Sequence, residues 1–367
     1  MSSMWLKAAF YQASQALGNT GKNPAVGCII VKDDEVVGVG YTSPNGRPHA
    51  EENALRMAGK KAVGSTMYIS LEPCCLDNNP NSCTNLIIKA GIKRVVVGML
   101  DNNKLTKGKS FQGLDKHGIE TELGRIDFED FLLNYSQYCL HVLNRPVVGI
   151  KLANSADSKI TYSSGHSKWI TSKLSRKHVH QIRSNYEAVL VGSNTSSLDN
   201  PSLTVRIKGY KKDIYRIIFD TNLKIKTDSN LIKTSQNNPL IIFTGKSINS
   251  KKAKSFISEG IKVFRVKKLK NGLLCIPSII KVLFELNIRK VLVEGGAKTA
   301  SSFLNSGYCD FLYIYRSSSF IGKKGLHSFD TLDEQKNFYL YSELTLKDNK
   351  LETWVNKKVL KIYKGIS

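Results

Sequence analysis

The sequence contains Pro48-His49-Ala50-Glu51, then 20 intervening residues, then Glu72-Pro73-Cys74-Cys75, and finally Cys83, nine positions after Cys74. Imidazole and thiolate groups suit Zn²⁺, and three protein ligands leave a fourth position for water. His49, Cys74 and Cys83 are therefore candidate ligands of a hydrolytic zinc site, at which bound water would ionise near neutral pH. Glu51 is the candidate to carry protons between that water and a leaving amine.

The spacing of these residues is close to the signature of zinc-dependent deaminases, which is His-x-Glu followed by Pro-Cys-x-x-Cys. His-Ala-Glu and Pro-Cys match, but the second cysteine lies nine positions after the first instead of three. Residues i and i+2 of a helix do not share a face. The arrangement therefore requires a metal off the N-terminal end of the helix that starts near Pro48. The alternative is that the histidine and cysteines are unrelated core residues.

Length and composition favour two globular domains in a reducing compartment. The chain has 367 residues, of which 41% are hydrophobic, so it exceeds a typical single core. Seven cysteines in a chain of this length do not suggest a secreted disulfide framework. No apolar run approaches the length of a membrane span, and the N-terminus lacks a signal-peptide pattern. We therefore expect a cytoplasmic protein with no membrane partner.

The chain is strongly basic, with a net charge of +24 from 54 Lys and Arg against 30 Asp and Glu. Such a charge is compatible with a nucleic-acid partner. The excess is mostly lysine, however, and it is spread along the chain without interleaved aromatic residues. A compositional drift toward Lys and Asn explains it better, so no nucleic-acid partner is expected. Anionic phosphorylated small molecules would also be attracted.

The first part of the chain mixes helices with short apolar strands. Spacing and turn residues predict helices over 5–17, 48–60, 84–90 and 128–144, and strands over 25–31, 36–41, 66–70, 94–99 and 119–123. Arg145-Pro146 is the best boundary. The expected domains are 1–145 and 146–367.

After Pro146 a second series of predicted strands and helices begins. Strands are predicted over 147–152, 188–191, 216–220, 240–244, 262–266, 290–294 and 311–316, and helices over 172–185, 277–286 and 297–305. This alternation argues for an α/β domain with a mainly parallel sheet. At Glu294-Gly295-Gly296-Ala297 a predicted strand is followed by a glycine pair and a helix. Backbone amides at the start of that helix can bind a phosphate. Alone, this is a weak signal.

With both halves in view, the chain resembles the RibD family of bifunctional riboflavin-biosynthesis deaminase/reductases over nearly its whole length. In the first half the resemblance rests on four segments: Asn23 to Cys28, His49-Ala50-Glu51, Glu72-Pro73-Cys74, and Cys83 at the family's long spacing. In the second half it rests on Lys151-Leu152, Gly165 to Thr171, Asp199 to Arg206, and Glu294-Gly295-Gly296. The order of these motifs makes the match specific.

The resemblance implies an α/β chain with a three-layer cytidine-deaminase-like N-terminal domain and a dihydrofolate-reductase-like C-terminal domain. The first would use zinc hydroxide to deaminate 2,5-diamino-6-ribosylamino-4(3H)-pyrimidinone 5′-phosphate. The second would use NADPH to reduce the ribosyl chain, giving 5-amino-6-ribitylamino-uracil 5′-phosphate. A homo-oligomer is also expected.

Carried over residue by residue, the resemblance places zinc on His49, Cys74 and Cys83 and proton transfer on Glu51. Cofactor contacts fall on Ala153, Trp169, Thr195, Asp199, Gly296, Ala297, Lys298, Thr299, Ala300, Ser301 and Ser302. Substrate contacts fall on Ser167, Arg183, Leu203, Arg206 and Glu294. The two arginines can hold a substrate phosphate by charge-assisted hydrogen bonds.

Two departures from the family pattern stand out. Residues 75–82 lack the family's cationic and imidazole groups, and Cys75 adds a possible zinc ligand beside Cys74. In the second half, the usual Asp-Gly is Asp157-Ser158, so the backbone geometry of that turn is in question.

Two rival functions remain. One is a nucleic-acid or nucleoside deaminase with an unrelated appendage, which a salt-sensitive shift of RNA would favour. The other is a reductase whose first half survives as a structural zinc domain, which separate assays of the two halves would distinguish.

Overall fold

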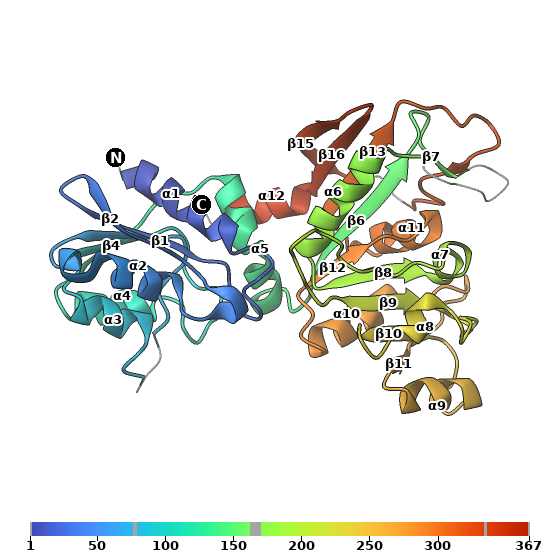
Figure 1. Cartoon of the computed structure of the whole chain (residues 1–367), viewed down its shortest axis with the longest axis horizontal. Helices are drawn as coiled ribbons and strands as arrows, with labels where there is room; N and C mark the ends of the chain where they lie inside the picture. The colour runs from blue at the N-terminus through green and yellow to red at the C-terminus, as the bar shows by residue number, and fades with distance from the viewer. Residues whose placement is uncertain (1, 76–78, 162–169, 334–335, 366–367) are drawn as a thin grey trace. The chain divides into compact units, whose positions relative to one another are not determined.

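The computed structural model describes residues 2–75, 79–161, 170–333 and 336–365. It divides into two compact units, one formed by 1–144 with 363–367 and the other by 145–362. Each unit has its own sheet (Figure 1).

The first unit is built on a sheet whose described strands run in the order β2-β1-β3-β4-β5. The strands are β1 (Gly27–Lys32), β2 (Glu35–Tyr41), β3 (Thr66–Ile69), β4 (Arg94–Val97) and β5 (Glu120–Leu123). The helices are α1 (Ser2–Gln15), η1 (Pro44–Gly46), α2 (Ala50–Ala58), η2 (Gly59–Ala62), α3 (Cys83–Lys89), α4 (Lys109–Asp115) and α5 (Phe128–His141). β1 and β2 form an antiparallel hairpin, whereas β3, β4 and β5 are mutually parallel.

Small residues let α1 and α2 pack closely on opposite faces of this sheet. A Cβ atom at Gly27 would lie 2.0 Å from the Ala9 carbonyl oxygen of α1, and one at Gly40 would lie 2.1 Å from the Ala50 oxygen of α2. Gly40 pairs with Cys28, so Gly27 and Gly40 point to opposite faces of the sheet. The result is the three-layer arrangement that the resemblance implies.

The second unit is built on a sheet whose nine described strands run in the order β11-β10-β9-β8-β12-β6-β13-β16-β15. Its strands are β6 (Val147–Asn154), β8 (Ala188–Gly192), β9 (Tyr215–Phe219), β10 (Leu240–Thr244), β11 (Lys262–Arg265), β12 (Lys290–Val293), β13 (Phe311–Ser317), β15 (Phe338–Leu346) and β16 (Asn349–Asn356). β7 (Lys159–Thr161) and β14 (Leu326–His327) pair separately. The helices are α6 (Lys173–Ser184), α7 (Ser193–Asp199), α8 (Asn230–Lys233), α9 (Lys251–Ser258), α10 (Ile276–Glu285), α11 (Ala297–Asn305) and α12 (Lys357–Lys364).

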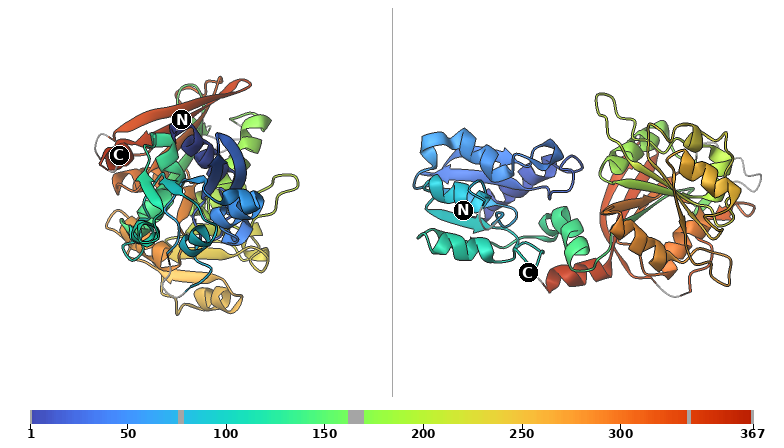
Figure 2. Two further views of the ribbon diagram at one scale, coloured as in Figure 1. Left: turned by 90° about the vertical axis from the view of Figure 1, so that its left-hand side faces the viewer. Right: turned by 90° about the horizontal axis from the view of Figure 1, so that it is seen from below.

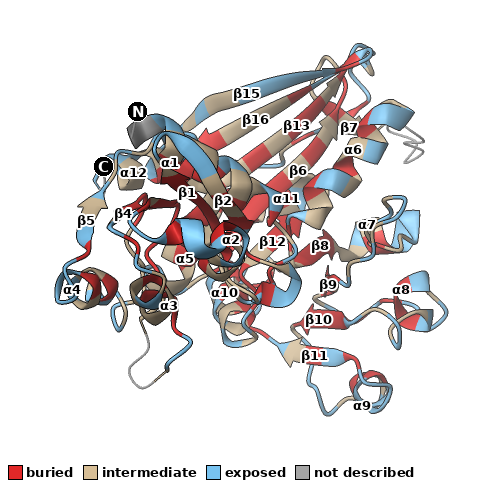
Figure 3. Ribbon diagram, turned by 60° about the vertical axis from the view of Figure 1, so that its left-hand side comes forward, coloured by how far each residue is buried: buried red, intermediate tan, exposed pale blue. Residues whose placement is uncertain are grey.

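All strand pairs from β11 to β13 are parallel, and the β16–β15 hairpin adds an antiparallel edge. Helices cover both faces of the sheet (Figure 2). One core lies between the sheet and α10 and α11, and the other lies on the α6 side. Because β8, β10 and β12 are covered on both faces, they are buried along nearly their whole length (Figure 3). The mainly parallel α/β prediction is confirmed.

The Asp157-Ser158 turn forms despite the absence of glycine. Ser158 adopts a left-handed φ of 59°. The Asp157 carboxylate accepts hydrogen bonds from the Ile321 and Gly322 amides at 3.0 and 2.7 Å, and from the Ser155 hydroxyl at 2.6 Å. These bonds hold the turn and offset the cost of placing a serine in this conformation.

Among the described residues, no helix combines the length and the apolar character needed to cross a membrane.

Candidate active sites

The structure brings His49, Cys74 and Cys83 together in the first unit, with their ligand atoms all within 4.8 Å of one another. Nδ1 of His49 lies 3.2 Å from Sγ of Cys83 and 3.7 Å from Sγ of Cys74. The backbone amide of Cys83 donates a hydrogen bond to Sγ of Cys74 at 3.3 Å. Residues that lie up to 34 positions apart in the chain thus form one cluster.

Three element ends place these side chains. His49 is the N-cap residue of α2, Cys83 is the first residue of α3, and Cys74 follows the end of β3. The cluster therefore lies off the N-terminal end of α2. His49 and Glu51 can both lie beside it there, although residues i and i+2 within a helix do not share a face. Neither residue has to reach the metal from the middle of a helix.

A hydrogen bond between the two cysteine side chains shifts their pKa values in opposite directions. A hydrogen bond from the Cys83 thiol lowers the pKa of Cys74 to about 4, although burial opposes this change. The same hydrogen bond raises the pKa of Cys83. One thiolate is therefore already favoured at neutral pH, as a zinc ligand requires.

Glu51 lies at the start of α2 and is 3% exposed. Burial raises its pKa, while the positive charge of His49 opposes that rise. Its carboxylate lies within hydrogen-bonding reach of the Cys83 thiol. Glu51 is thus beside the cluster, where a proton carrier is needed, without belonging to the three-residue ligand set.

Cys75 does not join the cluster. Its sulfur lies on the α4 side, 4.0 Å from the position that a Cβ atom at Gly113 would occupy. The metal-binding group found among the described residues contains Cys74 and Cys83 but not Cys75. Residues 76–78 of the altered loop lie outside the described residues.

Glu72 has a role that the sequence did not indicate. Its buried carboxylate accepts hydrogen bonds from the amides of Asp101, Gly108 and Ser110 at 3.0 to 3.2 Å, and from the Ser110 hydroxyl at 2.8 Å. Glu72 thereby ties the loop after β4 to the segment that carries Cys74. Its place in Glu-Pro-Cys was the only signal, because the bonded amides lie 29 or more positions away.

The donor set fits zinc. Two thiols and one imidazole are tetrahedral zinc ligands, and three ligands leave a position for water. The lowered pKa of Cys74 and the buried acid beside the cluster match that chemistry.

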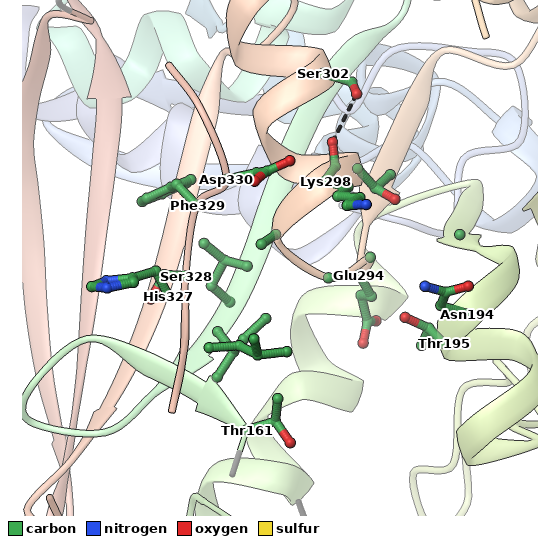
Figure 4. Close-up of a pocket in the computed structure, with 18 of the residues that line it drawn as sticks. Thr161, Asn194, Thr195, Glu294, Lys298, Ser302, His327, Ser328, Phe329 and Asp330 are labelled. Atoms are coloured by element: carbon green, nitrogen blue, oxygen red, sulfur yellow. Dashed lines mark hydrogen bonds between the residues drawn. The ribbon is translucent and has the colours of Figure 1, made fainter. Parts of the chain in front are cut away.

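The second unit contains a pocket of about 1110 Å³ at the carboxyl ends of its parallel strands. β6, β8, β9 and β13 contribute to its wall, together with Glu294 directly after β12. Figure 4 shows Glu294, Asn194 and Thr195 facing the segment His327–Asp330, with Lys298 and Ser302 on α11 nearby.

Glu294 is held in its charged form by two cations. Nε and an amino nitrogen of Arg183 donate to its carboxylate at 2.5 and 2.9 Å, and the Lys151 ammonium lies 3.6 Å away. Burial favours the neutral acid, but Arg183 and Lys151 lower the pKa of Glu294 to about 2. The third nitrogen of Arg183 donates to the Thr204 carbonyl at 2.9 Å. Arg183 therefore holds Glu294 in place in this structure.

Helix α11 presents one side to the pocket and the other to the core. Gly296, Ala297, Lys298, Thr299 and Ser302 line the pocket. Ala300 is fully buried in the core, and Ser301 is 4% exposed, with its hydroxyl accepting from the Asp330 amide. Ala300 packs in the core and Ser301 contacts the Asp330 amide, so neither side chain is part of the pocket lining.

The remaining proposed reductase contacts fall into three groups. Ala153, Thr195 and Asp199 line the pocket. Arg206 is exposed beside His180, whereas the Leu203 side chain is buried in the α6-side core, so any substrate contact by Leu203 would come from its backbone. Ser167 and Trp169 lie outside the described residues.

The pocket fits a dinucleotide cofactor. Its volume is large enough for a ligand of that size. Backbone amides at the start of α11 suit phosphates, since Gly296 caps this helix without a side-chain hydrogen bond. Gly295 permits this close turn, because a Cβ atom there would lie 2.5 Å from Cβ of Thr299.

Two family models match the chain. Residues 2–99 match the cytidine and deoxycytidylate deaminase zinc-binding region, and residues 146–360 match the RibD C-terminal domain.

Curated relatives and solved structures agree with this assignment. The chain is 39% identical to the riboflavin biosynthesis protein RibD of Aquifex aeolicus, over 87% of each chain. It is 36% identical to RibD of Bacillus amyloliquefaciens, over 88% of this chain and 86% of the relative.

Among solved structures, RibD of Acinetobacter baumannii superposes with a TM-score of 0.86 at 29% identity. The Thermotoga maritima diaminohydroxyphosphoribosylaminopyrimidine deaminase/5-amino-6-(5-phosphoribosylamino)uracil reductase superposes with a TM-score of 0.83 at 31% identity. Each comparison covers 97% of this chain and 98% of the other. The chain therefore belongs to the RibD family, and it is a bifunctional enzyme of riboflavin biosynthesis that joins a zinc-dependent deaminase to an NADPH-dependent reductase.

Proposed function

We propose that the chain acts on 2,5-diamino-6-ribosylamino-4(3H)-pyrimidinone 5′-phosphate. The first domain (1–145) removes the ring amine, and the second (146–367) reduces the ribosyl chain to give 5-amino-6-ribitylamino-uracil 5′-phosphate. The observation that carries this proposal is the cluster of His49, Cys74 and Cys83 beside buried Glu51, in the same chain as the pocket around Glu294. The name of the Thermotoga maritima relative describes the same two activities.

In the deaminase, His49, Cys74 and Cys83 hold the metal. Zinc supplies a Lewis acid that acidifies water at neutral pH. Glu51 takes a proton from the attacking water and delivers it to the leaving amine, since it lies beside the ligand cluster but outside the ligand set. The burial of this carboxyl limits competition from bulk water.

In the reductase, NADPH supplies the hydride. The start of α11, with Ala153, Thr195 and Asp199, binds the cofactor. Glu294 accepts hydrogen bonds from substrate hydroxyls, and Arg183 and Lys151 keep it charged and oriented. Arg206 is exposed and binds the substrate phosphate, because its guanidinium can form charge-assisted hydrogen bonds.

The chain's other expected properties belong to the same proposal. Its partner is a phosphorylated pyrimidine and not a nucleic acid. Its cysteines are not joined in disulfides, which fits the reducing cytoplasm. Assembly as a homo-oligomer follows from the family resemblance and can be measured by light scattering.

Metal analysis of matched cysteine variants tests the deaminase site. Wild-type protein and Cys75→Ser should each bind one zinc per chain, whereas Cys83→Ser should lose zinc and deamination together. Retention of zinc by Cys83→Ser, or its loss from Cys75→Ser, would show that the ligand set is wrong. Active wild-type enzyme without zinc would overturn the mechanism.

A further inference from the structure

Asn154 is the last residue of β6 and lines the reductase pocket. It is only 2% exposed, and its Oδ1 has no hydrogen-bond partner among the residues that the structure describes. A buried amide oxygen without a donor costs free energy, so such atoms are rare unless a ligand or water satisfies them. Neither the family resemblance nor the comparisons assign a role to this residue.

Three apolar side chains line the pocket near Asn154. Leu152 and Ile314 lie on the same face of the sheet, are 3% and 8% exposed, and also line the pocket. Ile160 adds a third apolar side chain. These three side chains form an apolar floor beside the Asn154 acceptor.

The cationic side chain next to Asn154 in the sheet already has hydrogen-bond partners. Arg316 is the strand partner of Asn154 in β13. Its guanidinium donates to the Glu352 carboxylate at 3.0 and 3.3 Å and to the Ser158 hydroxyl at 3.2 Å. This end of the pocket is therefore poorly suited to a phosphate, unlike the amides at the start of α11.

An acceptor on an apolar floor selects among the chemical groups that enter this pocket. A phosphate at neutral pH has few protons to donate, and a polyhydroxylated sugar chain would leave most of its hydroxyls without partners. A nicotinamide ring is flat and mainly apolar, and it carries one amide whose NH₂ is a donor. The neighbouring residue in the strand, Ala153, is an expected cofactor contact and lines the same pocket.

We propose that Oδ1 of Asn154 accepts a hydrogen bond from the carboxamide NH₂ of the cofactor's nicotinamide and so seats the ring on Leu152 and Ile314. The phosphates of the same cofactor then reach the start of α11, at another part of the pocket wall. Asn154 determines specificity for the carboxamide and takes no part in hydride transfer. This inference rests on the reductase function proposed for the second domain.

Calorimetric titration with oxidised cofactors tests the contact without any reaction. The probes are NADP⁺ and its 3-acetylpyridine analogue, in which a methyl group replaces the carboxamide NH₂. Wild-type protein should bind the analogue about tenfold more weakly than NADP⁺, because the methyl group leaves Oδ1 unpaired. Asn154→Ala should bind the two probes with nearly equal affinity, since the acceptor is gone.

Asn194→Ala is the matched control, because Asn194 is another asparagine that lines the pocket. It should keep the wild-type ratio of the two dissociation constants, whatever its effect on each. Equal affinities in wild type, or a wild-type ratio in Asn154→Ala, would overturn the inference. If Asn154→Ala does not fold, the affinities of the two probes for wild type still test the inference, because equal affinities would overturn it. Wild-type protein that binds neither probe would overturn the reductase proposal itself.

Discussion

At the scale of single residues, Glu51 and Glu294 are buried carboxylates whose surroundings act in opposite directions. Burial dominates at Glu51 and raises its pKa, whereas Arg183 and Lys151 overcome burial at Glu294 and lower its pKa to about 2. One acid is suited to exchange a proton, and the other stays ionised as a fixed acceptor. Two different chemistries therefore use the same residue type.

Glu51→Gln should keep zinc but reduce deamination by about 10²-fold or more, because the amide cannot carry the proton. Reduction of supplied deaminated intermediate should continue at the wild-type rate. Metal content, deaminase rate and reductase rate are measured on the same preparation. Near-normal deamination by this variant would exclude Glu51 as the proton carrier.

Glu294 should make the second unit's stability depend on acid pH. Its folded pKa of about 2 is below its ordinary value of 4.5, so its contribution is complete above that value and is lost as pH falls toward 2. The stability of wild type relative to Glu294→Gln should shrink by about 2 kcal/mol between about pH 6 and about pH 3. Denaturant unfolding of both proteins measures this difference. A constant difference would mean that Glu294 is not held charged by its neighbours.

At the scale of elements, the turn from β12 into α11 depends on close packing. Cβ atoms at Gly192 and Gly295 would lie 2.7 Å from Oγ1 and 2.5 Å from Cβ of Thr299, respectively. Glycine at both positions lets the start of α11 approach the ends of β8 and β12. That approach places Thr299 and its neighbours at the pocket wall.

Gly295→Ala should destabilise the second unit by about 1–3 kcal/mol, because Thr299 and the start of α11 must move. Gly296→Ala is the control, since among the described residues its added Cβ would meet only Ile160, at 4.0 Å. Thermal and denaturant unfolding of both variants measure the effect. Equal stabilities would contradict the packing argument.

Some elements could be predicted from the sequence because their signals are local. Helix 297–305 has the predicted bounds, since a glycine pair marks its start. Helix α7 is not among the predicted helices, because Ser193-Asn194-Thr195 favours caps and turns over helix interiors. No prediction was made for the β15–β16 hairpin, whose burial is irregular along β15.

Some residues of the candidate sites could likewise be predicted from the sequence, and others could not. His49, Cys74, Cys83 and Glu51 could be identified from short spacings. The bonds of Glu72 could not, because they depend on contacts between distant residues. The same holds for the unpaired Oδ1 of Asn154, which only the folded pocket reveals.

At the scale of the whole molecule, the chain carries two separate sites on two compact units. The units divide between residues 144 and 145, and the last residues from 363 cluster with the first unit instead of the second. Within that unit, the Tyr363 hydroxyl donates to the Ile126 carbonyl at 3.0 Å. The expected domains 1–145 and 146–367 remain a prediction.

The central claim is that one chain carries out deamination followed by reduction. Mass analysis of wild-type, zinc-loaded protein incubated with the diaminopyrimidinone phosphate, with and without NADPH, tests it most directly. Without NADPH, the substrate should be converted to the deaminated ribosylamino compound and accumulate there. With NADPH, two further hydrogens should appear in the product. Reduction without deamination, or no deamination at saturating substrate with zinc bound, would contradict the account and leave a reductase with a structural zinc domain.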